Sequence, residues 1–141
     1  MMKKITNSKR MELVLAKLCN YWETEDPRRV GGLTASQLSL LLSLSEHPGC
    51  RVQDTAERLD LTAPTISIGV RRLENMGLVQ RSADPDDQRA VCLYLSPQGR
   101  KIASKARSLR AAKLETMLSP LTVDEQESLL EMLEKVVPNT D

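Results

Sequence analysis

The chain has 141 residues, enough for one domain with a modest core or for a domain whose core is completed by a second copy. Only three residues are aromatic, so the core must be built mainly from aliphatic side chains, which favours helices. No apolar run reaches about 18 residues, which excludes a membrane span, and the net charge of +1 gives no overall basic signal.

The first predicted element is a helix over residues 9–24. Its apolar side chains recur at helical spacing, in the stripe Met11, Leu15, Leu18 and Trp22 with Val14 and Tyr21 beside it. We expect the helix to end before Pro27, because the residue that precedes a proline avoids helical geometry. Residues 28–32 then form a loop.

A capping box of Thr34 and Gln37 predicts the start of a second helix. This helix carries leucines on nearly every side and therefore belongs in a core. Its leucines are Leu38, Leu40, Leu41, Leu42 and Leu44. The residues 47–50 (His-Pro-Gly-Cys) end it, and His47 is most simply a loop residue.

Two short helices joined by a tight turn are predicted next. Residues 52–60 place Val52, Ala56 and Leu59 on one face. The following helix begins at Thr62, whose hydroxyl can cap free backbone N–H groups, and Pro64 is tolerated in its first turn. Gly77 suits a left-handed helix stop.

The helix after Thr62 has two different faces. Ile66, Val70 and Leu73 point inward together. The opposite face offers hydrogen-bond donors and little that demands burial, and it comprises Pro64, Ile68, Arg71 and Asn75, flanked by Ser67 and Arg72. This pattern predicts a contact surface.

A two-stranded ribbon is predicted over residues 78–82 and 89–95. In the second strand Val91, Leu93 and Leu95 alternate with Ala90, Cys92 and Tyr94 at period two. The connection, residues 83–88, is rich in turn-forming residues and too long for a two-residue hairpin. We therefore expect a protruding wing with Arg89 at its base and Arg81 on the opposite strand.

Two further helices complete the chain. Ser96 and Pro97 predict a helix start, with the helix running to about Leu118, and a capping box of Thr122 and Glu125 starts the last helix. The apolar stripes of the terminal helices are larger than one small wing module can cover. We expect them to pair with a second copy of the chain.

The charges are unevenly distributed despite their near balance. Residues 100–113 contain six basic side chains and no acidic one, whereas residues 114–141 contain seven acidic side chains and only Lys135 as a base. Such asymmetry can steer a phosphate backbone to one side of the molecule. A solvated helix face explains this feature equally well.

The cysteines and the single histidine offer no metal or disulfide framework. Cys19, Cys50 and Cys92 are far apart and lack a C-x-x-C pattern. The N-terminus has basic residues without an apolar stretch behind them, so we expect a cytoplasmic protein without a secretory signal. No cofactor is expected, and an enzyme is the least supported class because His47 has no evident partner.

Three motifs in sequence order resemble the MarR family of transcriptional regulators. They are Leu33-Thr-x-x-Gln37, the stretch from Thr62-x-x-Thr65-Ile-Ser67 through Arg72-Leu-Glu-x-x-Gly-Leu-Val79, and Asp84-Pro-x-Asp87-x-Arg89 followed by Leu93-x-Leu-Ser-Pro-x-Gly99. The resemblance implies a mainly α fold: a winged helix-turn-helix with a two-stranded β wing, flanked by dimerisation helices. We expect a DNA-binding domain over residues 33–99, a dimerisation helix and loop over 1–32, and dimerisation helices over 100–141.

The resemblance further implies a homodimer that binds pseudo-palindromic double-stranded DNA, usually as a repressor. The expected DNA-binding residues lie on the recognition helix and the wing: Thr62, Pro64, Thr65, Ser67, Ile68, Arg71, Arg72, Arg81, Asp87 and Arg89. Ile68 departs from the pattern, because many relatives have arginine there. It cannot donate to guanine but can touch a thymine methyl. Exposed charges paired with Glu74 or Asp86, and a wing ion pair between Asp87 and Arg89, are the alternative interpretations.

The resemblance also implies regulation, either by a small anionic or phenolic effector or through a cysteine that senses oxidants. The candidate ligand-binding residues are Met11, Tyr21, Trp22, Arg28 and Arg29, although dimer packing explains the first three more simply. Cys19 is the redox candidate, and a sensing thiol needs exposure and a lowered pKa. A winged-helix module that binds a protein without its own operator is the remaining alternative, and salt-dependent binding to duplex DNA distinguishes the two.

Overall fold

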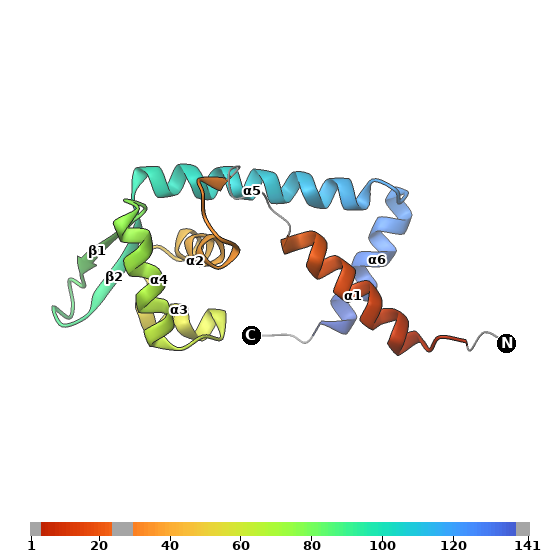
Figure 1. Ribbon diagram of the computed structural model, residues 1–141, viewed down its shortest axis with the longest axis horizontal. Helices are drawn as coiled ribbons and strands as arrows, with labels where there is room; N and C mark the ends of the chain where they lie inside the picture. The colour runs from red at the N-terminus through yellow and green to blue at the C-terminus, as the bar shows by residue number, and fades with distance from the viewer. Residues whose placement is uncertain (1–3, 24–29, 138–141) are drawn as a thin grey trace. The chain divides into compact units, whose positions relative to one another are not determined.

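The computed structural model describes residues 4–23 and 30–137. In chain order its elements are α1 (Asn7–Glu23), α2 (Ala35–Glu46), α3 (Val52–Leu59), α4 (Ala63–Asn75), β1 (Val79–Ala83), β2 (Val91–Leu95), α5 (Pro97–Leu118) and α6 (Val123–Val136). The chain is thus mainly α-helical, as expected (Figure 1). It divides into two compact units within α5, Met1–Ala103 and Ser104–Asp141.

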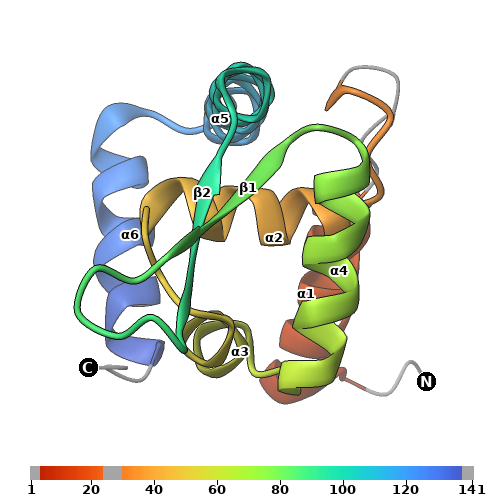
Figure 2. The same cartoon turned by 90° about the vertical axis from the view of Figure 1, so that its left-hand side faces the viewer.

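In the first unit, α2, α3 and α4 pack against one another, and the β1–β2 hairpin packs against all three helices. Figure 2 shows the hairpin running from the end of α4 across α2, with its connecting loop on the side away from α4. The core is aliphatic, as the composition predicts. Its fully buried large side chains include Leu33, Leu41, Leu44, Ile66, Leu73, Leu78 and Leu93. This arrangement is a winged helix-turn-helix.

The helix starts confirm the predicted capping signals. Thr34 and Gln37 form a complete capping box at α2, as do Thr122 and Glu125 at α6. At α4 the Thr62 side chain accepts a hydrogen bond from the Thr65 backbone N–H at 3.3 Å. These bonds satisfy N–H groups that have no partner inside the helix.

The two strands form one antiparallel ladder with Val79 opposite Leu95 and Ala83 opposite Val91. β2 begins at Val91 and not at Arg89, because Ala90 still belongs to the turn and accepts a bond from the Asp84 N–H at 3.0 Å. The alternation holds only in part. Leu93 and Leu95 are buried and Tyr94 is exposed, but Cys92 is buried and Val91, at the wing end, is exposed.

Hydrogen bonds attach the hairpin to its neighbours at both ends. Leu93 donates to the Cys50 carbonyl at 2.9 Å and accepts from Gly49, so Cys50 forms an isolated antiparallel bridge with β2. At the other end, the Ser96 hydroxyl donates to the Gly77 carbonyl at 2.6 Å, and the Ser96 Oγ accepts from the Gly99 N–H at 3.0 Å. The position of the wing relative to α4 is therefore set by hydrogen bonds as well as by packing.

Two glycines permit close approaches that a side chain would block. A Cβ on Gly99 would lie 2.2 Å from the Leu78 carbonyl oxygen, so α5 can begin beside this turn only with glycine there. A Cβ on Gly69 would lie 2.8 Å from Leu40 Cδ2, so α4 lies directly against α2.

The terminal helices leave their apolar side chains open to solvent. All side chains of α1 from Asn7 to Tyr21 are exposed. The other terminal helix, α6, buries none of its residues, and its Met132 is 58% exposed. No helix in the described part of the chain is long and apolar enough to span a membrane.

Candidate nucleic-acid interface

The outward face of α4 is polar and basic with one large apolar residue. Thr62, Thr65, Arg71 and Arg72 are exposed on or just before this helix, and Ser67 is half-buried. Ile68 is 54% exposed among them. Pro64 is also exposed in the first turn, where it takes no N–H away from the helix ladder. The structure thus brings together on one helix all seven residues that the sequence assigned to it.

The guanidinium groups of Arg71 and Arg72 have no hydrogen-bond or ion-pair partner among residues 4–23 and 30–137. Glu74, which the sequence offered as their partner, instead accepts a hydrogen bond from Arg81 Nε. Two basic side chains on α4 are therefore available for an external anion, whereas the Arg81 charge is already compensated from within the chain.

The loop between the strands presents Arg89 to solvent. Asp87 Oδ1 accepts a hydrogen bond from the Arg89 backbone N–H at 3.0 Å, and the Asp87 carbonyl accepts from Ala90 at 3.0 Å. The carboxylate of Asp87 therefore shapes the turn through the backbone. The Arg89 side chain is exposed and pairs with no other residue of the described ranges.

A contact between Arg51 and Asp84 ties the wing to the start of α3. Arg51 Nη2 donates to Asp84 Oδ2 at 2.7 Å, and the Asp86 N–H donates to Asp84 Oδ1 at 2.9 Å. The Asp86 N–H, and after it the Arg51 guanidinium, hold the pKa of Asp84 below its ordinary value. The same pairing raises the pKa of Arg51. No local sequence pattern predicts this contact, because the two partners are 33 positions apart in the chain.

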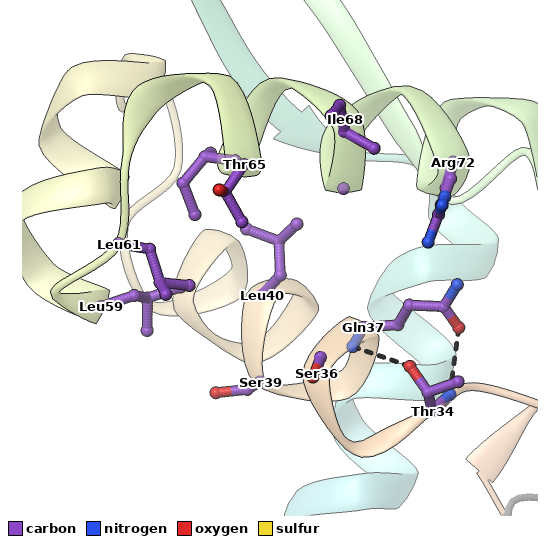
Figure 3. Close-up of a pocket in the computed structure, with 12 residues that line it drawn as sticks. Thr34, Ser36, Gln37, Ser39, Leu40, Leu59, Leu61, Thr65, Ile68 and Arg72 are labelled. Carbon is purple, nitrogen blue, oxygen red and sulfur yellow. Dashed lines mark hydrogen bonds between the residues drawn. The ribbon is translucent and has the colours of Figure 1, made fainter.

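A cavity of about 360 Å³ lies between α2 and α4. Gln37 of α2 and the N-cap residue Thr34 line it on one side, and Thr65, Ile68 and Arg72 of α4 line it on the other (Figure 3). No local sequence pattern predicts this cavity, since it forms only when α4 packs across α2 at Gly69. Three of the predicted DNA-contact residues of α4, Thr65, Ile68 and Arg72, therefore lie along one side of this cavity.

The remaining candidates lie elsewhere. Met11, Tyr21 and Trp22 belong to α1 and do not line this cavity. The other two ligand candidates, Arg28 and Arg29, lie outside the described residues. The effector site therefore stays a prediction.

The cysteines differ in their exposure. Cys19 is exposed, whereas Cys50 and Cys92 are buried. Burial, and then the negative charge of Asp84, raise the pKa of the Cys92 thiol, which disfavours the reactive thiolate. In the described ranges no group of three His, Cys, Asp or Glu side chains could hold a metal ion.

Comparison with known proteins identifies the chain's relatives. The MarR family model matches residues 33–91. The transcriptional repressor Rv2887 of Mycobacterium tuberculosis is 30% identical over 105 residues, which are 74% of this chain and 76% of that protein.

Two solved structures have the same fold. A probable transcriptional regulator from Pseudomonas aeruginosa is 30% identical, with a TM-score of 0.72 over 94% of this chain and 100% of its own. Streptococcus pneumoniae FabT, solved in complex with DNA, is 18% identical, with a TM-score of 0.82 over 93% of this chain and 94% of its own. At 18% identity, the similarity to FabT concerns the fold alone. The family match and the 30% identity to each of the two regulators together show that the chain belongs to the MarR family.

Proposed function

We propose that this protein is a homodimeric, sequence-specific DNA-binding regulator that represses transcription. The observation that carries the proposal is the outward face of α4, where exposed Arg71 and Arg72 lie beside hydroxyl groups and the wing presents Arg89. A helix fits the major groove, and arginine can read guanine there or bind phosphate. A narrow minor groove concentrates negative potential, which attracts an inserted arginine such as Arg89.

The relatives support this proposal. Rv2887 is named a transcriptional repressor. FabT, whose fold this chain shares, was solved in complex with DNA. The near-zero net charge of +1 is compatible with DNA binding, since phosphate recognition depends on where the basic side chains lie.

The exposed apolar faces of α1 and α6 support the homodimer. Leu15 of α1 is 47% exposed, and Leu130 and Val136 of α6 are 46% and 65% exposed. Exposed apolar side chains repeated along one helix face are typical of an interface between proteins. A twofold dimer would present two α4 helices to half-sites about one helical turn, roughly 34 Å, apart.

We further propose that a small anionic or phenolic molecule controls DNA binding. Met11, Tyr21 and Trp22 of α1 are the candidate contacts within the described residues, and Arg28 and Arg29 are the candidate charges. Binding of such a molecule to the DNA-free form would lower operator affinity through linkage. A titration of the protein–operator complex with salicylate as a probe tests this regulation, and unchanged affinity at saturating probe counts against an anionic phenolic effector.

Selection of bound fragments from genomic DNA, followed by titration of a selected duplex at several salt concentrations, tests the function. The proposal predicts enrichment of a pseudo-palindromic sequence and an affinity that falls steeply with salt, because phosphate contacts release counterions. Binding without sequence preference, or no binding to duplex DNA at low salt, would favour a winged-helix module that contacts a protein instead.

A further inference from the structure

We propose that Ile68 selects thymine in each half-site of the operator by packing against the 5-methyl group in the major groove. The inference rests on the proposed function and adds the identity of one base that α4 reads. Among the four bases only thymine presents a methyl group at this edge, and the other base edges offer hydrogen-bonding groups there.

The exposure of Ile68 is exceptional within its helix. Its side chain is 54% exposed, whereas Ile66, Val70 and Leu73 of the same helix are each at most 2% exposed. A single exposed apolar residue is common on protein surfaces and carries no function by itself. The proposed role of Ile68 in DNA recognition therefore depends on the residues around it.

Those neighbours are groups that bind nucleic acid. Thr65 precedes Ile68 by about one turn and Arg72 follows it by about one turn, and Figure 3 shows the three in order along α4. A helix rises about 1.5 Å per residue, so Ile68 lies roughly 4.5 Å from Thr65 and 6 Å from Arg72 along the axis. Stacked base pairs are about 3.4 Å apart. When Thr65 and Arg72 contact the DNA, Ile68 must face the base pairs between them.

The chemistry of isoleucine then determines which base fits. Ile68 has no donor or acceptor, so contact with guanine, cytosine or adenine edges would remove water from polar groups without replacing their hydrogen bonds. A thymine methyl has no hydrogen bond to lose and gains the burial of apolar surface. The branched side chain also has few χ1 rotamers in a helix, so little entropy is lost when it packs.

The residue after Ile68 lies where α4 approaches α2 closely. The adjacent Gly69 brings α4 so close to α2 that a Cβ there would lie 2.8 Å from Leu40 Cδ2. The backbone of α4 therefore packs closely against α2 beside Ile68, while the Ile68 side chain itself lines the cavity between the two helices. The flanking Arg71 and Arg72 are exposed and complement the phosphate backbone, which makes duplex DNA the occupant that this face fits.

The test replaces thymine by deoxyuridine, which pairs identically and lacks only the methyl group. Duplexes selected by the full-length protein are expected to contain a conserved thymine at one symmetric position in each half-site. Replacing it in both half-sites should weaken binding by the wild-type protein about 15-fold, or about fourfold per half-site, the equivalent of one buried methyl-sized group. The same replacement should change binding by Ile68→Ala less than twofold.

Two further variants make the comparison specific. Met76→Ala removes another exposed apolar side chain, at the end of α4, and should keep the full 15-fold sensitivity to deoxyuridine. Ile68→Arg should shift the selected base from thymine to guanine, because arginine donates to guanine O6 and N7. Thermal unfolding followed by circular dichroism should confirm that each variant folds, as expected for substitutions at exposed positions.

The outcomes separate the inference from the function on which it rests. If an operator is selected but deoxyuridine is neutral, or affects wild type and Ile68→Ala equally, the role of Ile68 is overturned while DNA binding stands. If no sequence is selected, the proposed function itself fails, and the inference fails with it.

Discussion

Arg51 and Asp84 join the start of α3 to the first residue of the wing loop through a hydrogen bond of 2.7 Å between Nη2 and Oδ2. Asp84 simultaneously accepts the Asp86 N–H within the loop at 2.9 Å. One carboxylate thus orders the turn and anchors it to the helix-turn-helix. Because Arg89 lies in the same loop, its position relative to α4 depends on this contact.

The pH dependence of the wing follows from the lowered pKa of Asp84. A carboxylate whose folded-state pKa lies below its ordinary value of 3.8 stabilises the fold above that value, and the contribution is lost as the pH falls through the lower folded-state pKa. We expect amide protection at Asp86 and Ala90 to be lost at acidic pH below 3.8 and to be constant from pH 5 to 8. Amide hydrogen exchange measured by NMR checks this expectation.

Asp84→Asn provides the control for that experiment. The amide can still accept from Asp86 but has no charge to attract Arg51, so protection should be weaker at neutral pH and independent of pH in the acidic range. Equal pH profiles for wild type and variant would show that another carboxylate governs the loop.

Replacing Arg89 by alanine should weaken binding to a selected operator at least about fivefold with little change in thermal stability. The side chain is exposed and forms no ion pair within the described ranges, so its loss removes a DNA contact without removing a fold contact. The slope of log affinity against log salt should also become shallower by up to about 1. Fluorescence anisotropy titrations at controlled ionic strength measure both quantities.

Lys135→Ala is the matched control, because it removes one exposed positive charge from α6. Its operator affinity should stay within about twofold of wild type. Equal losses for Arg89→Ala and Lys135→Ala would mean that only net charge matters and that the wing makes no specific contact.

Gly99→Ala should destabilise the fold by about 1–3 kcal/mol or more, because the new Cβ would lie 2.2 Å from the Leu78 carbonyl oxygen. Gly69→Ala should cost less, since its 2.8 Å contact is with the mobile end of Leu40 and alanine favours a helix. Thermal unfolding of both variants compares them. A higher Tm for Gly99→Ala than for Gly69→Ala would contradict the close approach of α5 to this turn.

Leu133→Glu should dissociate the proposed dimer. Leu133 belongs to the exposed apolar side chains of α6 and is 41% exposed in the single chain. Burying an unpaired carboxylate in an apolar interface is strongly unfavourable. Sedimentation equilibrium should show a mass near 15.8 kDa for the variant and about twice that for wild type. The exposed substitution Glu127→Gln should leave the dimer intact, and a dimeric Leu133→Glu would place the interface elsewhere.

Features that depend on neighbouring residues could be predicted from the sequence. The capping boxes at Thr34 and Thr122, the cap at Thr62 and the glycine stop at Gly77 each involve residues within one turn, and all are present. The inward face of α4 was predicted for the same reason, since helical periodicity is local.

Features that depend on distant residues were missed. The Arg51–Asp84 contact, the pairing of Arg81 with Glu74 and the approach of Gly99 to Leu78 arise only when separate elements pack together. The second strand begins two residues later than its alternation predicts, because Ala90 forms hydrogen bonds within the wing turn. The helical periodicity of the sequence predicts the apolar faces of α1 and α6. It does not identify the surface that covers them.

Methylation interference on a selected operator shows directly which grooves α4 and Arg89 enter, because dimethyl sulfate modifies guanine N7 in the major groove and adenine N3 in the minor groove. Entry of α4 and Arg89 into adjacent grooves predicts interference at guanine N7 in two half-sites about one helical turn apart, with adenine N3 interference beside each. The adenine signal should disappear with Arg89→Ala. Interference confined to one half-site, or no interference at guanine N7, would show that two α4 helices do not enter the major groove of one operator.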